Sequence, residues 1–311
     1  MITVLAGGVG AARLLRGVLA VHPPADVTAI VNTADDVELH GLYVSPDLDT
    51  VTYTLAGAIN PATGWGLVDE SWQAMETVRR YGGITWFNLG DRDLGTHLFR
   101  THRMGEGATL TEVTAEIVAA WSLGLRLLPV SDDPVRTMLT LEDGEEIGFQ
   151  DYFVRLRHSV PVTKVRLAGV AQARPGPDVL AAIADAEAIV IAPSNPAVSI
   201  DPVVAVPGVR AAVVAARAKT VAVSPLIGGK TVKGPADRLM LELGMEPTSV
   251  GIARAYRSLA TTLVLDTADA PLAAAVEVEG MTALVTPTLM SDDGVAGDLA
   301  RTTLAAVGVQ V

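Results

Sequence analysis

The N-terminal stretch MITVLAGGVGAARLL constrains the fold more than any other part of the chain. Its aliphatic residues 2–6 lead into paired glycines, and Ala-Arg-Leu-Leu follows, which predicts a buried strand, a tight turn and a helix start. Small residues let the backbone approach a ligand closely, and the free amides at a helix N-terminus attract an anion. We therefore expect a phosphate-binding turn at the edge of an α/β sheet, formed by Gly8, Gly10, Ala11, Ala12 and Arg13.

Three familiar phosphate loops match this turn incompletely. In the dinucleotide fingerprint G-x-G-x-x-G, Arg13 would occupy the position of the third glycine. A Walker A loop would require G-K-[ST], which is missing from this N-terminal turn. The turn also resembles the L-A-G-G-x-G-T-R-L loop of sugar nucleotidyltransferases, with one residue too many between Gly10 and Arg13. The loop by itself leaves the class of ligand open.

Composition limits the fold classes and the binding partners that are possible for this chain. The chain has 311 residues, of which 50% are apolar and only 4% aromatic, a balance typical of a Val/Ile/Ala/Leu-rich parallel sheet flanked by helices. A net charge of −12 argues against nucleic acid as a partner. A nucleotide is still compatible, because charges are screened over about 8 Å at physiological ionic strength. Since there is no cysteine, disulfides, thiolate metal sites and a Cys nucleophile are excluded.

Hydropathy predicts a cytoplasmic protein without a membrane partner. The longest uncharged apolar stretches fall short of the roughly 20 residues that a membrane-spanning helix needs. The N-terminus lacks the basic region of a signal peptide. We expect small-molecule substrates.

Hydrophobic periodicity predicts a single α/β domain over residues 1–311. A strand at 2–6, a helix at 9–20 and a strand at 27–31 form one βαβ unit, and further strands are expected at 125–130, 188–192 and 220–224, with helices at 208–217 and 235–243. Helical patterns at 65–82, 91–101 and 110–123, with a strand-like segment at 84–90, predict an insertion or cap around 60–124. Residues 136–150 read as a β-hairpin. We expect a Rossmann-like, doubly wound, mostly parallel sheet with helical and β-hairpin insertions.

Polar residues follow nearly every predicted strand. In open α/β sheets the ligand binds beyond the carboxyl ends of the strands, so these residues are expected to meet there. Carboxylates beside a phosphate loop favour Mg²⁺, which prefers one or two carboxylates together with waters and phosphate oxygens. Asp47 and Asp49 are two residues apart, which places both on one side of an extended chain. The candidate metal ligands are Asp35, Asp36, Asp47 and Asp49.

The segment SPLIGGKTVKG (224–234) predicts a second anion site. It combines Gly229, Lys230 and Lys233 with a helix that begins near Pro235. The alternative is a glycine-rich surface turn with two solvated lysines.

Four other side chains have both a functional and a structural interpretation. His40 and His97 are candidate bases, although a lone histidine is more often structural, and Trp86 and Tyr43 could stack on a planar ring or pack in the core.

Taken together, these motifs resemble one family closely. In order and spacing, LAGGVGAARLL, VNTADD, HGLYVSPDLDT, WFNLGDRDLGTHLFRT, SDDPVRT, IAPSNPAVSI and SPLIGGKTVKGPADR are similar to the 2-phospho-L-lactate transferases, CofD in archaea and FbiA in actinobacteria. The resemblance implies a step in the biosynthesis of coenzyme F(420). A guanosine-diphosphate-linked phosphoenolpyruvate or 2-phospho-L-lactate donates its phosphorylated acid to the ribityl hydroxyl of the deazaflavin FO, and GMP leaves. It also implies Mg²⁺ and a homodimer.

The resemblance implies roles for individual residues. Asp49 and Asp36 are the expected catalytic carboxylates, with Asp49 orienting or deprotonating the hydroxyl and Asp35, Asp36 or Asp47 helping it to hold Mg²⁺. Ser194 and Asn195 are expected on the guanosine side, and Lys230 and Lys233 near the developing charge. The expected FO pocket comprises Asp49, Thr50, Trp86, Asn88, Asp91 and Thr96.

Three other functions stay open at this stage. A nucleotide-sugar transferase or pyrophosphorylase rests on LAGGVG alone, and a non-enzymatic guanine-nucleotide-binding regulator would bind without turnover. An NAD-dependent oxidoreductase is disfavoured because Asn32 lies where a ribose-binding acid should end the second strand. Mass spectrometry of ligands retained on purification separates these functions.

We predict that Lys230→Ala or Lys233→Ala lowers guanine-nucleotide affinity, or kcat/KM for the donor, by at least about tenfold. A charge-assisted hydrogen bond to phosphate contributes about 1.5–3 kcal/mol, whereas a solvated lysine contributes almost nothing. The free energy of unfolding should stay within about 0.5 kcal/mol of wild type. If neither substitution changes binding or turnover more than about twofold, the segment is an ordinary turn.

Overall fold

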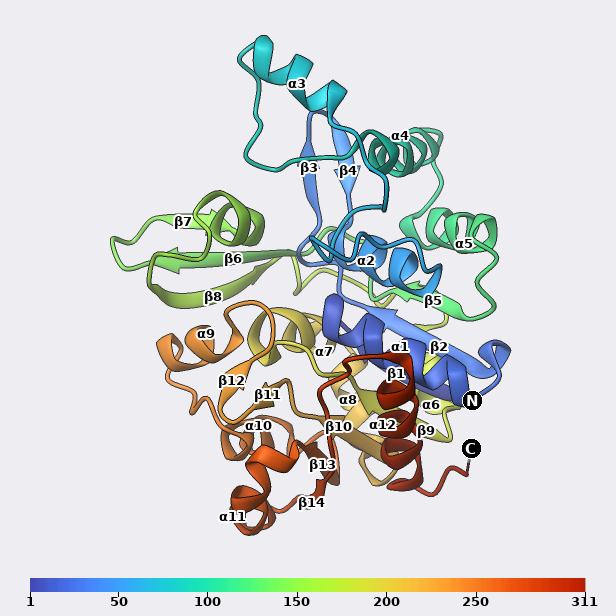
Figure 1. The fold of residues 1–311 in the computed structure, drawn as a ribbon, viewed down its shortest axis with the longest axis vertical. Helices are drawn as coiled ribbons and strands as arrows, with labels where there is room; N and C mark the ends of the chain where they lie inside the picture. The colour runs from blue at the N-terminus through green and yellow to red at the C-terminus, as the bar shows by residue number, and fades with distance from the viewer. Residues whose placement is uncertain (311) are drawn as a thin grey trace.

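A seven-stranded parallel sheet forms the centre of the computed structural model, which describes residues 1–310 (Figure 1). Its order is β14-β13-β10-β9-β1-β2-β5, so the chain winds outward from β1 in both directions. This is the doubly wound arrangement that the sequence predicts. The strands are β1 (Ile2–Ala6), β2 (Val27–Val31), β5 (Arg126–Pro129), β9 (Ala188–Ile191), β10 (Thr220–Val223), β13 (Thr262–Leu265) and β14 (Thr282–Val285).

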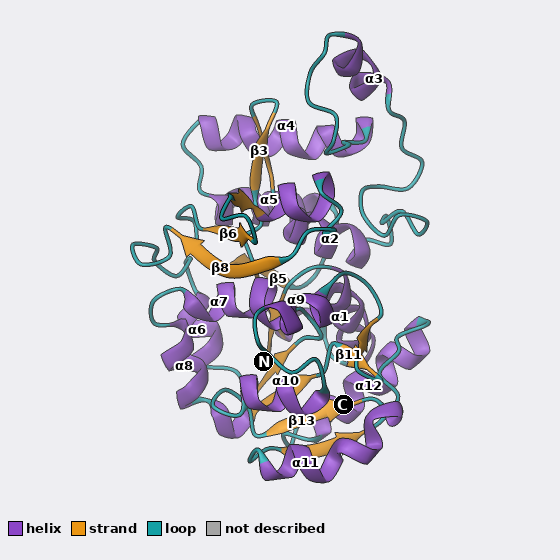
Figure 2. Cartoon of the chain, turned by 90° about the vertical axis from the view of Figure 1, so that its left-hand side faces the viewer, coloured by secondary structure: helices purple, strands orange, loops and turns teal. Residues whose placement is uncertain are grey.

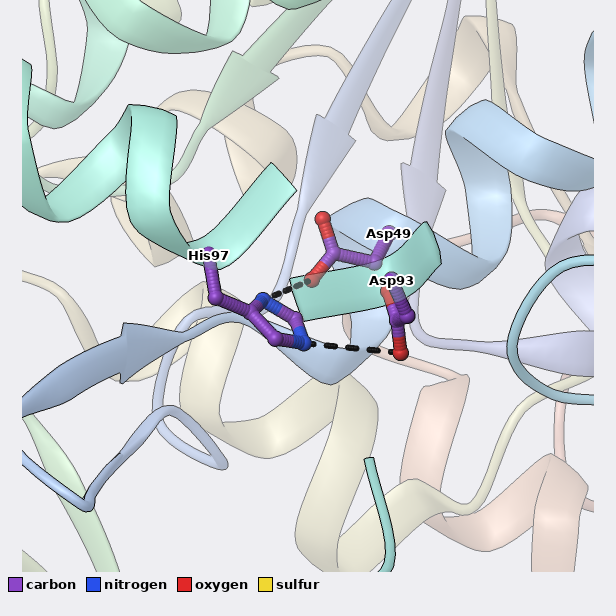
Figure 3. A group of neighbouring side chains, drawn as sticks. All are labelled: Asp49, Asp93 and His97. Atoms are coloured by element: carbon purple, nitrogen blue, oxygen red, sulfur yellow. Dashed lines mark ion pairs between the residues drawn. The ribbon is translucent and has the colours of Figure 1, made fainter. Parts of the chain in front are cut away.

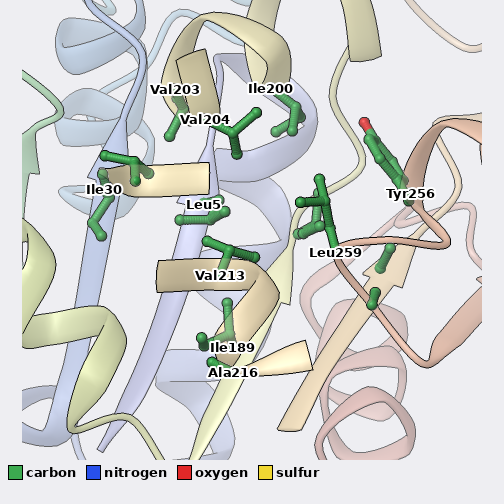
Figure 4. Close-up of a cluster of buried hydrophobic side chains, with 14 of the residues drawn as sticks. Leu5, Ile30, Ile189, Ile200, Val203, Val204, Val213, Ala216, Tyr256 and Leu259 are labelled. Carbon is green, nitrogen blue, oxygen red and sulfur yellow. The ribbon is translucent and has the colours of Figure 1, made fainter. Parts of the chain in front are cut away.

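Both faces of the sheet are buried, which explains why its strands are apolar without alternation. All five residues of β1 are buried, and Leu5 pairs in register with Ile30 on β2 and Ile191 on β9. These three side chains belong to the core on one face, shown in Figure 4, whereas Val4 and its neighbours Ala29 and Val190 belong to the core on the other.

Helices cover the two faces in separate layers. One face packs against α6 (Val179–Ala184), η3 (Pro196–Ile200), α7 (Asp201–Ala205), α8 (Val209–Ala215), α9 (Ala236–Glu242), α10 (Ser249–Tyr256) and α11 (Ala273–Val278). The other packs against α1 (Val9–Val21), α2 (Pro46–Leu55), α5 (Leu110–Ala120) and α12 (Asp293–Ala305). Short turns of 3-10 helix lie at Pro24–Asp26, Arg217–Lys219 and Thr267–Leu272.

No single helix within residues 1–310 is long and apolar enough to cross a membrane. The segments 196–205 and 209–215 satisfy the length and composition criteria only as a pair bent by 93°. Their apolar side chains, including Ile200, Val203 and Val213, lie in the core of the sheet.

Two groups of elements extend beyond the carboxyl ends of the central strands (Figures 1 and 2). The upper group contains β3 (Val37–Leu39), β4 (Leu42–Val44), α3 (Gln73–Arg80) and α4 (Asp91–Gly105). Beside it lies an antiparallel sheet of order β7-β6-β8, formed by β6 (Arg136–Leu141), β7 (Glu146–Gly148) and β8 (Val162–Ala168). The π-helix η2 (Asp151–Arg155) lies in the chain between β7 and β8. A two-stranded ribbon, β11 (Leu226–Ile227) and β12 (Lys230–Thr231), carries the lysine segment.

Two local predictions are wrong, and one strand is absent from the predictions. The helix expected over 65–82 begins only at Gln73, because Gly66 and Asp69 adopt left-handed backbone angles, with φ of 67° and 57°. Residues 84–90 form a loop and not a strand. The hairpin of β6 and β7 was expected, but its third strand, β8, was not.

We predict that Gly17→Ala lowers the free energy of unfolding by about 1–3 kcal/mol, the usual cost of overpacking a core. A Cβ at Gly17 would lie 2.1 Å from the carbonyl oxygen of Ala296, so α1 and α12 would have to separate. Urea unfolding measures the loss. As the control, Gly95→Ala on the exposed face of α4 meets no atom within 4 Å and should stabilise by about 0.5–1 kcal/mol. Equal effects of the two substitutions would contradict the prediction.

Candidate active site

The predicted phosphate loop, residues 7–13, lies beyond the ends of β1 and β9, the two strands between which the strand order of the sheet reverses. A Cβ at Gly10 would lie 2.2 Å from the carbonyl oxygen of Pro193, so only glycine allows α1 to begin this close to the end of β9. The amide of Gly7 donates to Oγ of Ser194, 3.3 Å away. The amide of Ala12 donates to the carbonyl oxygen of Gly8 at 3.0 Å and is therefore already used within the helix, so the amides that face a ligand are those between Gly7 and Ala12. The phosphate contact itself stays a prediction.

Two carboxylates meet at this loop through one amide. The Nδ2 atom of Asn32, directly after β2, donates to Oδ2 of Asp35 at 3.1 Å and to Oδ2 of Asp47 at 3.0 Å. The other oxygen of Asp47 would lie 2.6 Å from a Cβ at Gly8. In the sequence, Asn32 argues only against NAD, whereas in the structure it joins the acidic residues to the phosphate loop.

Asp47 and Asp49 do not share one side, which corrects the expectation for this pair. Both lie in the first turn of α2, which begins at Pro46. Two residues along a helix turn through about 200°, so the two carboxylates diverge. Asp47 faces the phosphate loop, and both oxygens of Asp49 accept hydrogen bonds from the guanidinium of Arg100.

Asp49 belongs to a buried network with α4 (Figure 3). The imidazole of His97 lies between two carboxylates, with Nδ1 3.7 Å from Oδ2 of Asp49 and Nε2 3.4 Å from Oδ2 of Asp93. Tyr53 donates its hydroxyl to Oδ1 of Asp93 at 2.6 Å. Asp49, Asp93 and His97 are close enough to hold a metal ion. However, the two ring nitrogens face different carboxylates and Arg100 already neutralises Asp49, so the network is better described as structural.

Burial strongly changes the proton affinity of the other three aspartates. It raises the pKa of Asp36 to about 7, although Arg136 and Arg100 act in the opposite direction. Burial also raises the pKa of Asp47 to about 6, and burial together with the charge of Asp47 raises the pKa of Asp35 well above its ordinary value. Oδ1 of Asp35 and Oδ1 of Asp36 have no hydrogen-bond partner among the described residues. Such a cluster of desolvated, unpartnered carboxylate oxygens suits a divalent cation.

A cavity of about 230 Å³ opens beside these aspartates, between the end of β2 and the antiparallel sheet. Its lining includes Asp35 and Asp36 from one side and Arg136, Thr137 and Gln150 from the other. The side-chain amide of Gln150 donates to the carbonyl oxygen of Asp35 at 2.9 Å. Sequence reasoning did not single out any of the last three residues.

The lysine segment reaches the site through one of its two lysines. Nζ of Lys233 donates to the carbonyl oxygen of Thr63 at 3.1 Å, and partial burial together with the nearby charge of Arg13 lowers its pKa. Arg13 donates to the carbonyl oxygen of Met290 at 3.4 Å. Lys230 is exposed on β12, next to Gly229 with its φ of 74°, and its side chain makes no hydrogen bond in the described part of the chain. Lys233 is therefore the stronger candidate.

The residues expected on the guanosine side both have local partners. Oγ of Ser194 accepts from the amide of Gly7, as described above. The side-chain oxygen of Asn195 accepts from the amide of Ala197 at 3.0 Å and caps η3. Both residues lie at the end of β9, beside the phosphate loop, and their contact with guanosine stays a prediction.

Several residues of the expected FO pocket have structural partners as well. Asp91 accepts from Oγ of Ser71 and from the amides of Gln73 and Ala74, so it holds the start of α3. Thr96 bonds the hydroxyl of Tyr53 at 2.7 Å, and Thr50 is buried on α2. Trp86 packs edge-on against Phe87, and Asn88 is half-buried in the loop before α4. The assignment of this pocket stays a prediction, while His40 lies exposed at the tip of the β3–β4 turn.

One sequence signal could have revealed the network on α4. Asp93, His97 and Arg100 are spaced i, i+4 and i+7, which places all three on one face of a helix. Arg136 and Gln150 carry no comparable signal, because only the folded chain brings the antiparallel sheet against the end of β2.

Comparison with known proteins identifies relatives of this chain and of its fold. Residues 2–287 match the family described as 2-phospho-L-lactate transferase CofD. A phosphoenolpyruvate transferase of Streptomyces griseus subsp. griseus is 46% identical over 308 residues, covering 97% of each chain. One from Mycobacterium avium is 41% identical over 333 aligned positions, covering 99% of each. A solved UPF0052-family protein of Bacillus halodurans shares the fold, with a TM-score of 0.64 at 19% identity over 97% of this chain and 99% of that one.

We predict that Asp36→Asn raises the melting temperature by several degrees at pH 8 in EDTA, but not at pH 4. The folded state raises the pKa of Asp36 from 3.8 to about 7, so this group's contribution to stability is fully present below pH 3.8 and is lost as the pH rises through 7. Asparagine keeps the shape and cannot ionise. Thermal denaturation measures the effect, and exposed Asp185→Asn is the control. A similar change at both pH values would contradict the prediction.

Proposed function

The chain belongs to the CofD family of 2-phospho-L-lactate transferases, and from this premise we propose that it transfers phosphoenolpyruvate from a guanosine-diphosphate-linked donor to the ribityl hydroxyl of FO in coenzyme F(420) biosynthesis. The names of its relatives, phosphoenolpyruvate transferases at 40–46% identity, favour phosphoenolpyruvate over phospholactate. One structural observation carries the proposal: Asn32 holds the carboxylates of Asp35 and Asp47 together against a phosphate loop.

In this reaction, the ribityl oxygen attacks the phosphorus atom that bears the enolpyruvyl group. The bond from that phosphorus to the bridging oxygen breaks, and GMP leaves with the bridging oxygen. The hydroxyl proton passes to a base. Because no covalent enzyme intermediate is needed, the protein contributes mainly positioning and charge stabilisation.

The phosphate loop and two cations account for the donor's diphosphate. The free amides before Ala12 and the positive end of α1 bind phosphate oxygens. Arg13 and Lys233 lie near each other at this loop, and the charge of one lowers the pKa of the other. Two cations held together in this way favour an anion between them.

The carboxylates of Asp35 and Asp47 fit Mg²⁺. Their burial, their junction at Asn32 and the unpartnered Oδ1 of Asp35 all favour a bound cation. Asp49 fits poorly, because Arg100 already occupies both of its oxygens. When bound, Mg²⁺ neutralises charge on the diphosphate.

Asp36 is the better candidate for the general base. One of its oxygens accepts from Oγ of Ser45 at 3.0 Å, which fixes the carboxylate, and the other has no partner within residues 1–310. Asp36 also lines the cavity. Asp49 acts instead as a positioning residue, since its ion pair with Arg100 ties α2 to α4.

The test is turnover of purified protein with FO and the guanosine-diphosphate-linked donor, followed by mass spectrometry. We expect GMP and the phosphodiester product in Mg²⁺, none in EDTA, and recovery when Mg²⁺ is restored. Asp36→Asn should lower kcat by at least about 100-fold, the usual contribution of a general base, while leaving GDP affinity within about twofold of wild type.

Two outcomes would contradict parts of this proposal. Full activity in EDTA removes the metal assignment, and a normal kcat in Asp36→Asn removes the base assignment. Asp185→Asn, on the exposed surface, is the matched control for the loss of a carboxylate.

A further inference from the structure

The cavity beside Asp36 has the size of a small substituent and not of a whole substrate. Its volume is about 230 Å³, whereas pockets for drug-sized ligands measure about 300–1,000 Å³. The cavity is thus smaller than a pocket that encloses a whole nucleoside or deazaflavin, and its size suits a three-carbon acid.

Arg136 is the cation among the residues that line this cavity. Its Nη1 donates to the carbonyl oxygen of Val135 at 2.9 Å, and its guanidinium carbon lies 5.7 Å from the centre of the Tyr43 ring. The backbone and the ring thus hold the guanidinium in place. Its charge acts on the nearby Asp36, but Arg136 forms no ion pair within residues 1–310. Since arginine has five N–H donors, several are available to a ligand. Arg100, by contrast, is already paired with Asp49.

The acidic residues of the cavity lining have other partners than Arg136 or are exposed. Asp151 pairs with Arg155 at 2.7 Å, and Glu38 is exposed. Asp36 accepts from Ser45, and Asp35 accepts from Asn32. The cavity therefore has an acidic side, toward the proposed metal site and base, and a basic side at Arg136. Met138 and Phe149 add apolar surface to the lining.

We propose that Arg136 binds the carboxylate of the donor's three-carbon acid and thereby selects donors that carry one. The inference rests on the proposed function. The donor has two phosphates, which the loop amides, Arg13 and Lys233 serve, and one further anion, the carboxylate. A planar guanidinium matches a carboxylate with two parallel hydrogen bonds, which a lysine cannot do. A carboxylate bound in this cavity lies next to Asp36. The reacting phosphorus must also lie near Asp36 if Asp36 is the base.

The test compares two donors in wild type and in Arg136→Gln: the guanosine-diphosphate-linked phosphoenolpyruvate and its carboxylate methyl ester. We expect Arg136→Gln to lower kcat/KM at least about tenfold for the natural donor and less than about twofold for the ester. The affinity for GDP should stay within about twofold. These values follow from the loss of one charge-assisted contact, at about 1.4 kcal/mol for each factor of ten.

Arg166→Gln is the matched control. Arg166 lies on the same antiparallel sheet, opposite Met138, but is exposed and pairs with Glu146. It should leave both donors unchanged. If Arg136→Gln weakens both donors equally, or neither, Arg136 does not read the carboxylate and the inference is wrong.

Two further measurements keep the inference separate from the proposed function. If Arg136→Gln does not fold, Arg136→Lys is expected to lose part of the activity with the natural donor only, and unchanged kinetics would overturn the inference. If wild type transfers neither donor, the proposed function fails. In that case, calorimetric binding of the two donors to wild type and Arg136→Gln still tests the carboxylate contact, with equal affinities counting against it.

Discussion

The close approach of α1 to the end of β9 is the contact on which the site depends. Because Gly10 lies against the carbonyl of Pro193, the first turn of α1 opens directly onto the point where the sheet reverses its winding. Its free amides then face the polar segments that follow β1, β2 and β9. Any side chain at Gly10 would push α1 away, and the loop, Asn32 and Asp47 would no longer meet.

Charge organises the rest of the site into two parts. On α4, Arg100 neutralises Asp49, and Asp93 and His97 complete a buried network that fixes the upper elements to α2. Around Asn32 no cation forms an ion pair with the carboxylates within residues 1–310. Burial therefore raises their pKa values, although Arg136 and Arg100 partly oppose this at Asp36, and two of their oxygens have no hydrogen-bond partner. A chain rarely retains this arrangement unless a ligand compensates for it. The first part is thus complete within the protein, while the second is the part that we propose binds a metal ion and substrate.

The antiparallel sheet forms the side of the cavity that faces the end of β2. It places Arg136 and Gln150 opposite Asp35 and Asp36, residues that follow a strand of a different sheet. In the proposed function, the small cavity between them holds the acid of the donor, and the phosphate loop holds the diphosphate. We propose that each kind of group has one role in this geometry. The amides and two cations bind the diphosphate, the carboxylates bind the metal ion and accept the proton, and one guanidinium binds the acid.

The sequence by itself determined the parallel sheet, the glycine turn after β1 and the proximity of Asp35, Asp36 and Asp47 beyond the strand ends, because period, glycine placement and strand-end polarity are local properties of the chain. That these carboxylates bind metal and that the turn binds phosphate stay predictions. The sequence misplaced Asp49 because a helix beginning at Pro46 looks, residue by residue, like an extended polar loop. It also missed Arg100 and Arg136 as functional groups. Each acquires its partner from a segment that lies more than thirty positions away, Asp49 for Arg100 and Tyr43 for Arg136, and only tertiary packing decides which distant charges share a low-dielectric interior.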